Sequence, residues 1–366
     1  MARRTTITQL ARELKVHPST VSLGLRGSYH VSKPLQHRIR SLAQQRGYSP
    51  NHMARSLRRR ATKTLGAIFP YATSPYYATL LDALYTETLT RGFHLEVCFH
   101  QWSATEETAM LRTMVERQVE GLILLPASET TFATLQDMSP SLNAVPVAML
   151  GYVNAAHIPH GVRGIVYTDM EEGSRELGEF LLGMGHRHIA LLSPNPPPSK
   201  SRARIAYRAD RETGLRKAFR ADPEARLEVL HAEETEIPTS RESAVDKSFD
   251  LARQVAERFL ELSPRPTAAI TTNEVGAYVL IERLHAAALR VPEDVSVACY
   301  DGTFLSEFGP VALTCVKQPL REFARNLAEL ATDAGEDHEA RKPEVRILKP
   351  TLVPRRSVAR ITALER

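Results

Sequence analysis

The chain has 366 residues, of which 43% are hydrophobic and 24% charged, a composition typical of a globular protein with two or three domains. It contains no run of about 18 apolar residues, which excludes a membrane-spanning helix, and its N-terminus lacks the apolar core of a secretion signal. We therefore expect a cytoplasmic protein. The three cysteines (Cys98, Cys299 and Cys315) are scattered, which excludes a disulfide framework and a cysteine-rich zinc site.

Charge is divided unevenly along the chain. Residues 1–63 contain fourteen lysines and arginines and a single acidic residue, Glu13, whereas the remaining residues contain 33 basic and 41 acidic side chains. The two parts therefore carry formal charges of +13 and −8. A basic segment attached to an acidic body predicts a small module that binds a polyanion. Its regular apolar spacing argues against a disordered basic tail.

Three short helices are predicted in the basic segment. Apolar residues repeat at helical spacing in residues 7–14, 21–25 and 35–43, and the third helix is expected to end at Gly47. The expected N-caps are Thr5 or Thr6, His17 and Ser32. A tight turn at Lys15 and Val16 joins the first two helices. This order predicts a helix-turn-helix bundle whose second helix, beginning at Pro18, enters the major groove of DNA.

Four short segments of this region carry a family resemblance. They are TTITQLAREL (5–14), STVS (19–22), HVS (30–32) and RGYSPNHMARSL (46–57). In this order they resemble the LacI/GalR (lactose-repressor/galactose-repressor) family of bacterial transcription regulators. The resemblance implies a homodimer that binds a pseudo-palindromic operator, with residues 50–57 folding into a hinge helix on DNA.

The resemblance also implies which residues contact DNA. Pro18, Ser19 and Leu23 would face base edges, and Ala54 and Leu57 would enter the minor groove, with Leu57 wedged into a base step. The full expected set is Thr6, Pro18, Ser19, Thr20, Ser22, Leu23, Tyr48, Asn51, His52, Ala54, Arg55, Leu57 and Arg58. Many relatives have an arginine or lysine where this chain has Leu23. Since only Ser19 of the three base-facing residues forms hydrogen bonds, we expect shape and methyl contacts to dominate, with specificity shifted to the hinge.

From Thr64 onward, apolar strand-like runs alternate with helical patterns. Runs at residues 65–69, 94–98, 121–125 and 147–150 recur roughly every 25 to 30 residues, the length of a βαβ unit. After Thr168 the rhythm restarts, with runs at residues 189–192, 268–271 and 295–300. These patterns predict an α/β body of two doubly wound parallel-sheet lobes. Residues 185–194, 271–284 and 289–302 resemble the family's ligand-binding body, which is similar to periplasmic sugar-binding proteins.

The predicted organisation has four parts. They are a helix-turn-helix domain at 1–49, a hinge and linker at 50–63, an effector-binding and dimerisation domain at 64–355 and a C-terminal tail at 356–366. We expect the N-lobe of the body to hold about residues 64–168 and 298–322, and the C-lobe about 169–297 and 323–355. The tail lacks sustained heptads, so a tetramerisation coiled coil is not expected.

Ligands of such sheets bind beyond the carboxyl ends of the strands. Asn273 and Asp301 follow predicted strands, and the resemblance implies that Arg211 precedes a helix and binds the effector. It further implies cleft positions for the aromatic pair Tyr76 and Tyr77 and for Gln318. Carboxylate, amide and guanidinium groups together hold vicinal hydroxyls, which indicates a sugar or sugar derivative.

One departure from the family leaves the ligand class open. Gly151 stands where many members have an aspartate after the fourth strand. The missing acceptor leaves sugar, sugar acid, nucleobase and phosphorylated ligands as alternatives. Basic residues at Lys200, Arg202 and Arg204 would favour an anionic one.

Enzyme signatures are absent from the sequence. No GxSxG, GxxxxGK[ST] or HExxH motif occurs, and His186 and His188 lie two residues apart at a strand entrance, a poor chelate. We expect no enzyme activity, cofactor or metal. We therefore predict an effector-responsive, sequence-specific repressor. The alternatives are a cytoplasmic sugar-processing enzyme with an incidental basic head and an architectural DNA binder without ligand response, which the polar-lined body disfavours.

Overall fold

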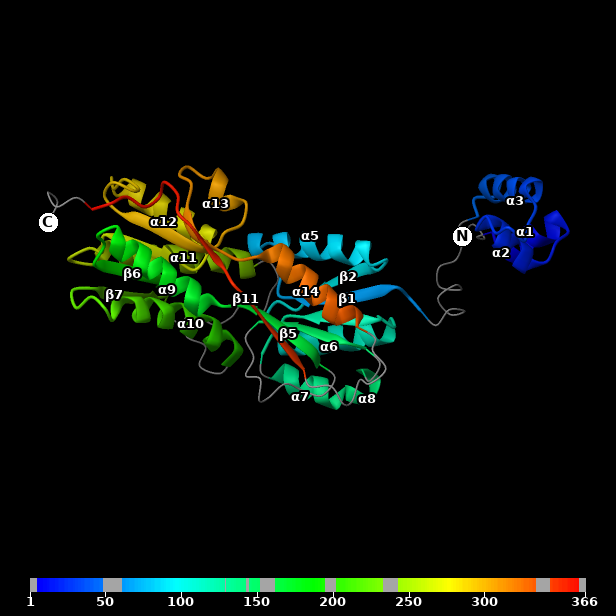
Figure 1. The fold of residues 1–366 in the computed structure, drawn as a ribbon, viewed down its shortest axis with the longest axis horizontal. Helices are drawn as coiled ribbons and strands as arrows, with labels where there is room; N and C mark the ends of the chain where they lie inside the picture. Colours follow the sequence, from blue (N-terminus) through cyan, green and yellow to red (C-terminus); the bar gives the residue numbers. More distant parts are fainter. Residues whose placement is uncertain are drawn as a thin grey trace. The chain divides into compact units, whose positions relative to one another are not determined.

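The chain forms two compact units, Met1–Thr62 and Lys63–Arg366. In this computed structural model (Figure 1) the described residues are 5–48, 61–128, 130–142, 145–151, 162–194, 202–232, 243–333 and 343–361. Within these ranges no helix is long and apolar enough to cross a membrane. The first unit is helical and the second contains two six-stranded sheets.

The first unit, called the head below, contains the three helices predicted from the sequence. They are α1 (Ile7–Leu14), α2 (Pro18–Leu25) and α3 (Lys33–Gln45). Thr6 caps α1 and forms a reciprocal capping box with Gln9. Lys15 ends α1 in a left-handed conformation (φ 54°), which makes the sharp turn into α2. The head core consists of Leu10, Ala11, Val21, Val31, Ile39 and Ala43.

The second unit, called the body, begins with the first sheet. Its strands are β1 (Thr64–Phe69), β2 (His94–Phe99), β3 (Gly121–Leu124), β4 (Val147–Leu150), β5 (Val162–Thr168) and β11 (Glu344–Leu348), in the order β11-β5-β4-β3-β1-β2. All neighbours are parallel. Helices α5 (Pro75–Thr90) and α14 (Leu320–Thr332) cover one face. The other face is covered by α6 (Ala104–Glu116), α7 (Thr130–Asp137) and α8 (Ser139–Leu142).

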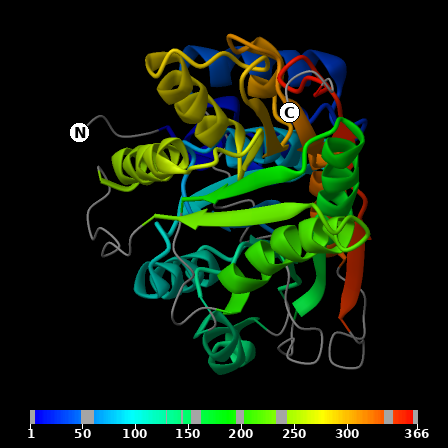
Figure 2. The ribbon, with the colours of Figure 1, turned by 90° about the vertical axis from the view of Figure 1, so that its left-hand side faces the viewer.

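The second sheet repeats this plan, except that its edge strand β12 pairs antiparallel with β10. Its strands are β6 (His188–Ser193), β7 (Arg226–His231), β8 (Ala268–Thr271), β9 (Ser296–Asp301), β10 (Thr314–Lys317) and β12 (Thr351–Val353), in the order β12-β10-β9-β8-β6-β7. Helices α9 (Met170–Gly183) and α10 (Arg202–Phe219) cover one face, and α11 (Ser243–Glu261) and α12 (Glu274–Ala286) the other. Figure 2 shows β6 and β7 between these two helical layers. The short helix α13 (Leu305–Phe308) follows β9.

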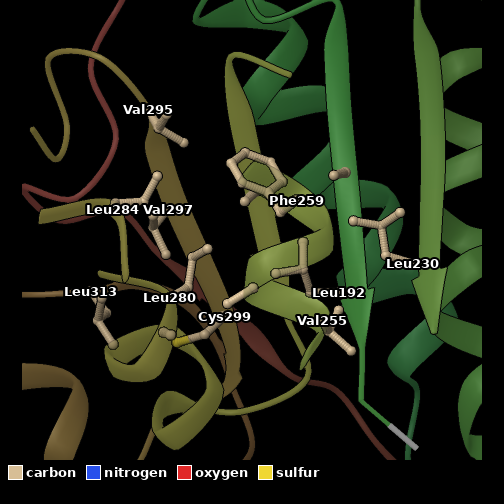
Figure 3. Close-up of a cluster of buried hydrophobic side chains, with 14 of the residues drawn as sticks. Leu192, Leu230, Val255, Phe259, Leu280, Leu284, Val295, Val297, Cys299 and Leu313 are labelled. Atoms are coloured by element: carbon tan, nitrogen blue, oxygen red, sulfur yellow. The ribbon is translucent and has the colours of Figure 1, made fainter. Parts of the chain in front are cut away.

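The second sheet and its helices, called the second lobe, enclose a buried core. Phe259 of α11, Leu280 of α12 and Cys299 of β9 are fully buried between these helices and the sheet (Figure 3). A core of this density holds the ends of β8 and β9 in fixed positions. The predicted fold class, a helical head with a doubly wound two-lobed body, is confirmed.

The predicted division of the body between the lobes was wrong in its second half. Strands β9 and β10 pair with each other and with β8, so residues 298–317 belong to the second lobe. Helix α14 packs on α5, and β11 pairs with β5, so α14 and β11 belong to the first lobe (Figure 1). An amphipathic pattern predicts that one face of a helix is buried, but it does not predict which sheet covers that face. The assignment of these segments to a lobe therefore could not be made from the sequence.

The segment expected to start a C-terminal tail is part of the body. Ser357 donates its hydroxyl to the Val297 carbonyl and accepts the Thr314 backbone N–H at 2.8 Å, and the Ile361 backbone N–H donates to Met184 at 2.9 Å. Residues 356–361 therefore join the ends of β9, β10 and α9.

Candidate functional sites

The head presents α2 with a histidine at its N-cap, as predicted. Pro18 occupies the first turn, and the Nδ1 atom of His17 accepts the backbone N–H of Ser19 at 3.3 Å. The same Nδ1 lies 2.7 Å from the Ser19 hydroxyl. Ser19 is exposed, whereas Pro18 and Thr20 are half-buried.

The other predicted DNA contacts within the described head are less accessible or already engaged. Thr6 is exposed, but its side chain is engaged in the α1 cap. Leu23 and Tyr48 are half-buried and pack against the head core. Ser22 lies under Arg26, whose guanidinium donates to the Ser22 carbonyl at 3.2 Å and approaches its hydroxyl at 3.4 Å. Ser19 is therefore the base-facing candidate with the most accessible polar atoms.

The predicted hinge contacts remain predictions. Asn51, His52, Ala54, Arg55, Leu57 and Arg58 lie outside the described residues. The wedge role of Leu57 stays a prediction.

In the body, the ends of two neighbouring strands bring together three predicted effector residues. Asp301 ends β9 and is 8% exposed, and the side-chain amide of Gln318, just after β10, donates to its Oδ1 atom at 2.8 Å. The Nη2 atom of Arg211 lies 3.8 Å from the same oxygen. Burial raises the pKa of Asp301, and Arg211 and Gln318 oppose this rise by stabilising the carboxylate.

Arg211 is held by a residue that the sequence did not single out. Its guanidinium carbon lies 4.7 Å from the centre of the Tyr300 ring, a cation–π distance. The Tyr300 hydroxyl donates to Ser174 at 2.9 Å, because Ser174 uses its own hydrogen toward the Met170 carbonyl at 2.6 Å. The Nε atom of Arg211 is buried without a hydrogen-bond acceptor among the described residues, so this donor is available to a ligand.

Arg211 was expected to precede a helix. In the structure it lies in the middle of α10. The stretch RARIAYRADRETG has charged residues at nearly half of its positions, so the start of this helix carries no clear apolar periodicity. Tyr300 was missed because it reads as one more residue of a buried strand.

Asn273 and its neighbour Glu274 lie between the end of β8 and the first turn of α12. Asn273 caps α12, accepting the Gly276 backbone N–H at 2.8 Å. Glu274 is 1% exposed and accepts the Thr303 backbone N–H at 2.5 Å. Burial, and next the charge of Asp301, raise the pKa of Glu274 to about 7. Glu274 escaped the sequence analysis, although its position directly after Asn273 was the available signal.

The predicted tyrosines lie on the other lobe, at the matching edge of the first sheet. Tyr76 and Tyr77 begin α5, and the Tyr77 ring makes edge contacts with Tyr71 at 5.5 Å and Tyr76 at 5.3 Å between ring centroids. Trp102 follows β2, with its ring 5.7 Å from that of His100. The six predicted effector residues thus form two groups: a polar one on the second sheet and an aromatic one on the first.

The glycine that replaces the family's aspartate has a backbone role. Gly151 follows β4 with φ 105°, a conformation that disfavours other residues, and its N–H donates to Val166 at 3.0 Å. The histidines considered as a chelate have separate partners: His186 binds Thr267 and Ala359, and His188 binds Glu228.

Comparisons with known proteins match this architecture. Residues 179–358 match the model of the periplasmic binding protein-like domain. The HTH-type transcriptional repressor PurR of Vibrio cholerae is 27% identical over 361 residues, covering 98% of this chain and 99% of the relative. A lac repressor dimer bound to operator and the anti-inducer ONPF superposes with a TM-score of 0.75 at 22% identity, covering 98% of this chain and 100% of that one. The transcriptional regulator CelR in complex with cellobiose gives 0.62 at 24%, covering 97% and 100%.

These matches support a resemblance of the whole chain to LacI/GalR-family transcriptional regulators. The resemblance carried by the four N-terminal segments is confirmed. PurR is named as a transcriptional repressor, and its match spans both units of this chain.

Proposed function

We propose that the protein is an effector-responsive repressor that binds a pseudo-palindromic DNA operator as a homodimer. The observation that carries this proposal is the presence, in one chain, of a helix-turn-helix head and a buried Arg211–Asp301–Gln318 group at the carboxyl edge of a sheet. The first feature is suited to reading DNA and the second to holding a small polar ligand. Relatives of similar length include a lac repressor dimer bound to operator and CelR bound to cellobiose.

The domain plan follows from the same reasoning. Residues 1–49 would bind the major groove, residues 50–63 would form the hinge, and the body from residue 64 would bind effector and dimerise. Arg58, Arg59, Arg60 and Lys63 would neutralise phosphates, each contact adding about −0.9 to the salt slope of affinity. The cytoplasm, where the DNA is, would be its compartment.

The charges around Asp301 favour a neutral, hydroxyl-rich effector. Arg211 is shared with Asp301, and Glu274 is a second buried carboxylate, so the group has no surplus positive charge for an anion. Asp301 and Gln318 offer acceptors and donors for neighbouring hydroxyls, and tyrosine rings suit the apolar face of a sugar ring. A carbohydrate-like effector is therefore preferred over a phosphorylated one. Of the anionic candidates, Lys200 lies outside the described residues.

Ligand binding would act through a shift in populations. An effector that holds the lobes in one arrangement changes the cost of forming the hinge helix, by a coupling free energy of about 1–3 kcal/mol. Induction and corepression use the same parts and differ in the sign of this coupling.

Three measurements test the proposal, two on the full chain and one on a truncated chain. Selection from a random duplex library should yield a pseudo-palindromic sequence, and a chain beginning at residue 61 should lose DNA binding while keeping its ligand response. A thermal-shift screen with sugars, sugar acids and nucleobases should give a neutral sugar as the strongest stabiliser, since ligand at 100 times its Kd adds about 2.7 kcal/mol. Equal DNA affinity without the head would refute the assignment of the DNA site.

A further inference from the structure

The N-cap of α2 fixes the direction of a hydrogen bond. A backbone N–H can only donate, so the Ser19 N–H that points at His17 Nδ1 requires a lone pair on that nitrogen. The Ser19 hydroxyl lies 2.7 Å from the same atom, which leaves the hydroxyl as the donor in this pair as well. The only hydrogen of the Ser19 hydroxyl is thereby directed into the protein.

The consequence is a change in what Ser19 offers to solvent. A free serine hydroxyl donates or accepts, and therefore suits several bases. With its hydrogen committed to His17, the exposed Ser19 oxygen presents lone pairs alone. In the major groove, the base groups that donate to such an oxygen are the amino groups of adenine (N6) and cytosine (N4).

Neighbouring side chains do not supply the missing donor. Leu23 is apolar and packs against the head core, and Pro18 has neither a polar side chain nor an N–H. Arg26 is folded back onto Ser22, with Nε on the carbonyl and Nη2 near the hydroxyl. Ser19 is thus the polar group through which the start of α2 reaches a base edge.

We propose that His17 is a positioning residue that makes Ser19 a hydrogen-bond acceptor, so that α2 selects an adenine or cytosine at one position of each half-site and rejects guanine and thymine there. The proposal rests on the DNA-binding function proposed above. His17 acts through Ser19 and itself touches no base.

The test compares full-length wild type with His17→Asn and Ser19→Ala. Asparagine is among the most favourable N-caps, so His17→Asn keeps α2 capped while removing the imidazole acceptor. His37→Asn, at an exposed histidine of α3, is the matched control. Each protein is used to select duplexes from a random library, and its affinity is then measured for the selected duplex with each base in turn at the position that responds to Ser19.

Wild type and His37→Asn should prefer adenine or cytosine at that position. Replacing the base by purine or pyrimidin-2-one, which lack the amino group, should weaken binding about fivefold, the effect of one hydrogen bond. Ser19→Ala should lose the same factor and be insensitive to the replacement. His17→Asn should bind the consensus well and accept guanine or thymine about as readily, because the Ser19 hydroxyl is then free to donate.

Three results would overturn the proposal. They are a wild-type preference for guanine or thymine, indifference to the missing amino group, and a His17→Asn variant that loses affinity for every duplex equally with its preferences unchanged. The last would mean that His17 only stabilises the helix. A wild type that selects no sequence at all would instead remove the DNA-binding function, and this inference with it.

Discussion

Asp301 and Gln318 are joined twice across the ends of two parallel strands. The Gln318 side-chain amide donates to the Asp301 carboxylate at 2.8 Å, and the Gln318 backbone N–H donates to the Asp301 carbonyl at 3.0 Å. These bonds hold Asp301 at φ 81°, a left-handed conformation that is costly for residues other than glycine, asparagine and aspartate. The carboxylate is therefore fixed in direction before a ligand arrives, which reduces the ordering cost of binding.

Asp301→Asn should weaken ligand binding while leaving DNA binding intact. Asparagine tolerates the left-handed conformation and keeps an oxygen for Gln318, so the fold should be retained. The charge opposite Arg211 is lost, and with it one charge-assisted contact to ligand hydroxyls worth about 1.5–3 kcal/mol, or roughly 10- to 100-fold in affinity. Thermal shift with the strongest stabiliser from the ligand screen measures this loss. An unchanged ligand shift would place the effector elsewhere.

Glu274→Gln should change how stability depends on pH. The pKa of Glu274 is raised to about 7 in the folded protein, from an ordinary value of 4.5, so the folded state binds this proton more tightly than the unfolded state. Stability from this group is full below about pH 4.5 and is lost as the pH rises toward 7. Glutamine keeps an oxygen for Thr303 without the charge, so the variant should not lose stability over this pH range. Above pH 7 its free energy of unfolding should exceed that of wild type by at most roughly 3 kcal/mol.

Urea unfolding of both proteins between pH 5 and 8 checks this prediction. The variant should become the more stable of the two as pH rises. Parallel pH profiles would mean that Glu274 stays charged, for example because Thr303 and solvent compensate for its burial.

Local features of this chain were predictable from sequence, because short-range chemistry decides them. The His17 and Thr6 caps and the strands around Val147 and Ala268 follow from side-chain type and spacing over a few residues. Asn273 and Asp301 could be nominated because a position after a strand is itself a local property.

The features that were not predicted from the sequence depend on packing between distant segments. Tyr300 supports Arg211 because α10 passes over β9, a relationship that no local pattern encodes. The same holds for α14, whose amphipathic face gave no indication that it returns to the first sheet. The paired role of His17 and Ser19 depends on an interatomic distance, whereas local patterns assign His17 to the helix cap and Ser19 to DNA contact separately.

Gln36→Ala should loosen the head selectively. The Gln36 amide donates both hydrogens, to the carbonyls of Ser28 at 2.9 Å and Val31 at 2.8 Å, and so fixes the turn between α2 and α3. Losing both bonds inside a nearly buried site should cost about 1–3 kcal/mol. Hydrogen exchange of the full chain should show faster exchange in α1–α3 and no change in the body. Gln44→Ala, at an exposed position of α3, is the control, and an equal effect there would refute the role of the turn.

Gly214→Ala should weaken both the second lobe and its ligand response. A β-carbon at Gly214 would lie 2.1 Å from the Glu171 carbonyl oxygen and 2.7 Å from the Ser174 side chain, so α10 would have to move away from α9. Overpacking of this kind costs about 1–3 kcal/mol. The movement would also disturb the Ser174–Tyr300 contact on which Arg211 rests.

Gly183→Ala provides the matched control for this variant. Gly183 is the last residue of α9, and nothing lies within 4 Å of a β-carbon placed there. Alanine should therefore leave the unfolding temperature unchanged or raise it slightly, because alanine favours helix by up to about 1 kcal/mol over glycine. Gly214→Ala should lower the unfolding temperature by several degrees and reduce ligand stabilisation, with DNA affinity in the absence of ligand retained. If both variants behave alike, the α9–α10 contact does not position Arg211, and the direct Asp301 contact alone must do so.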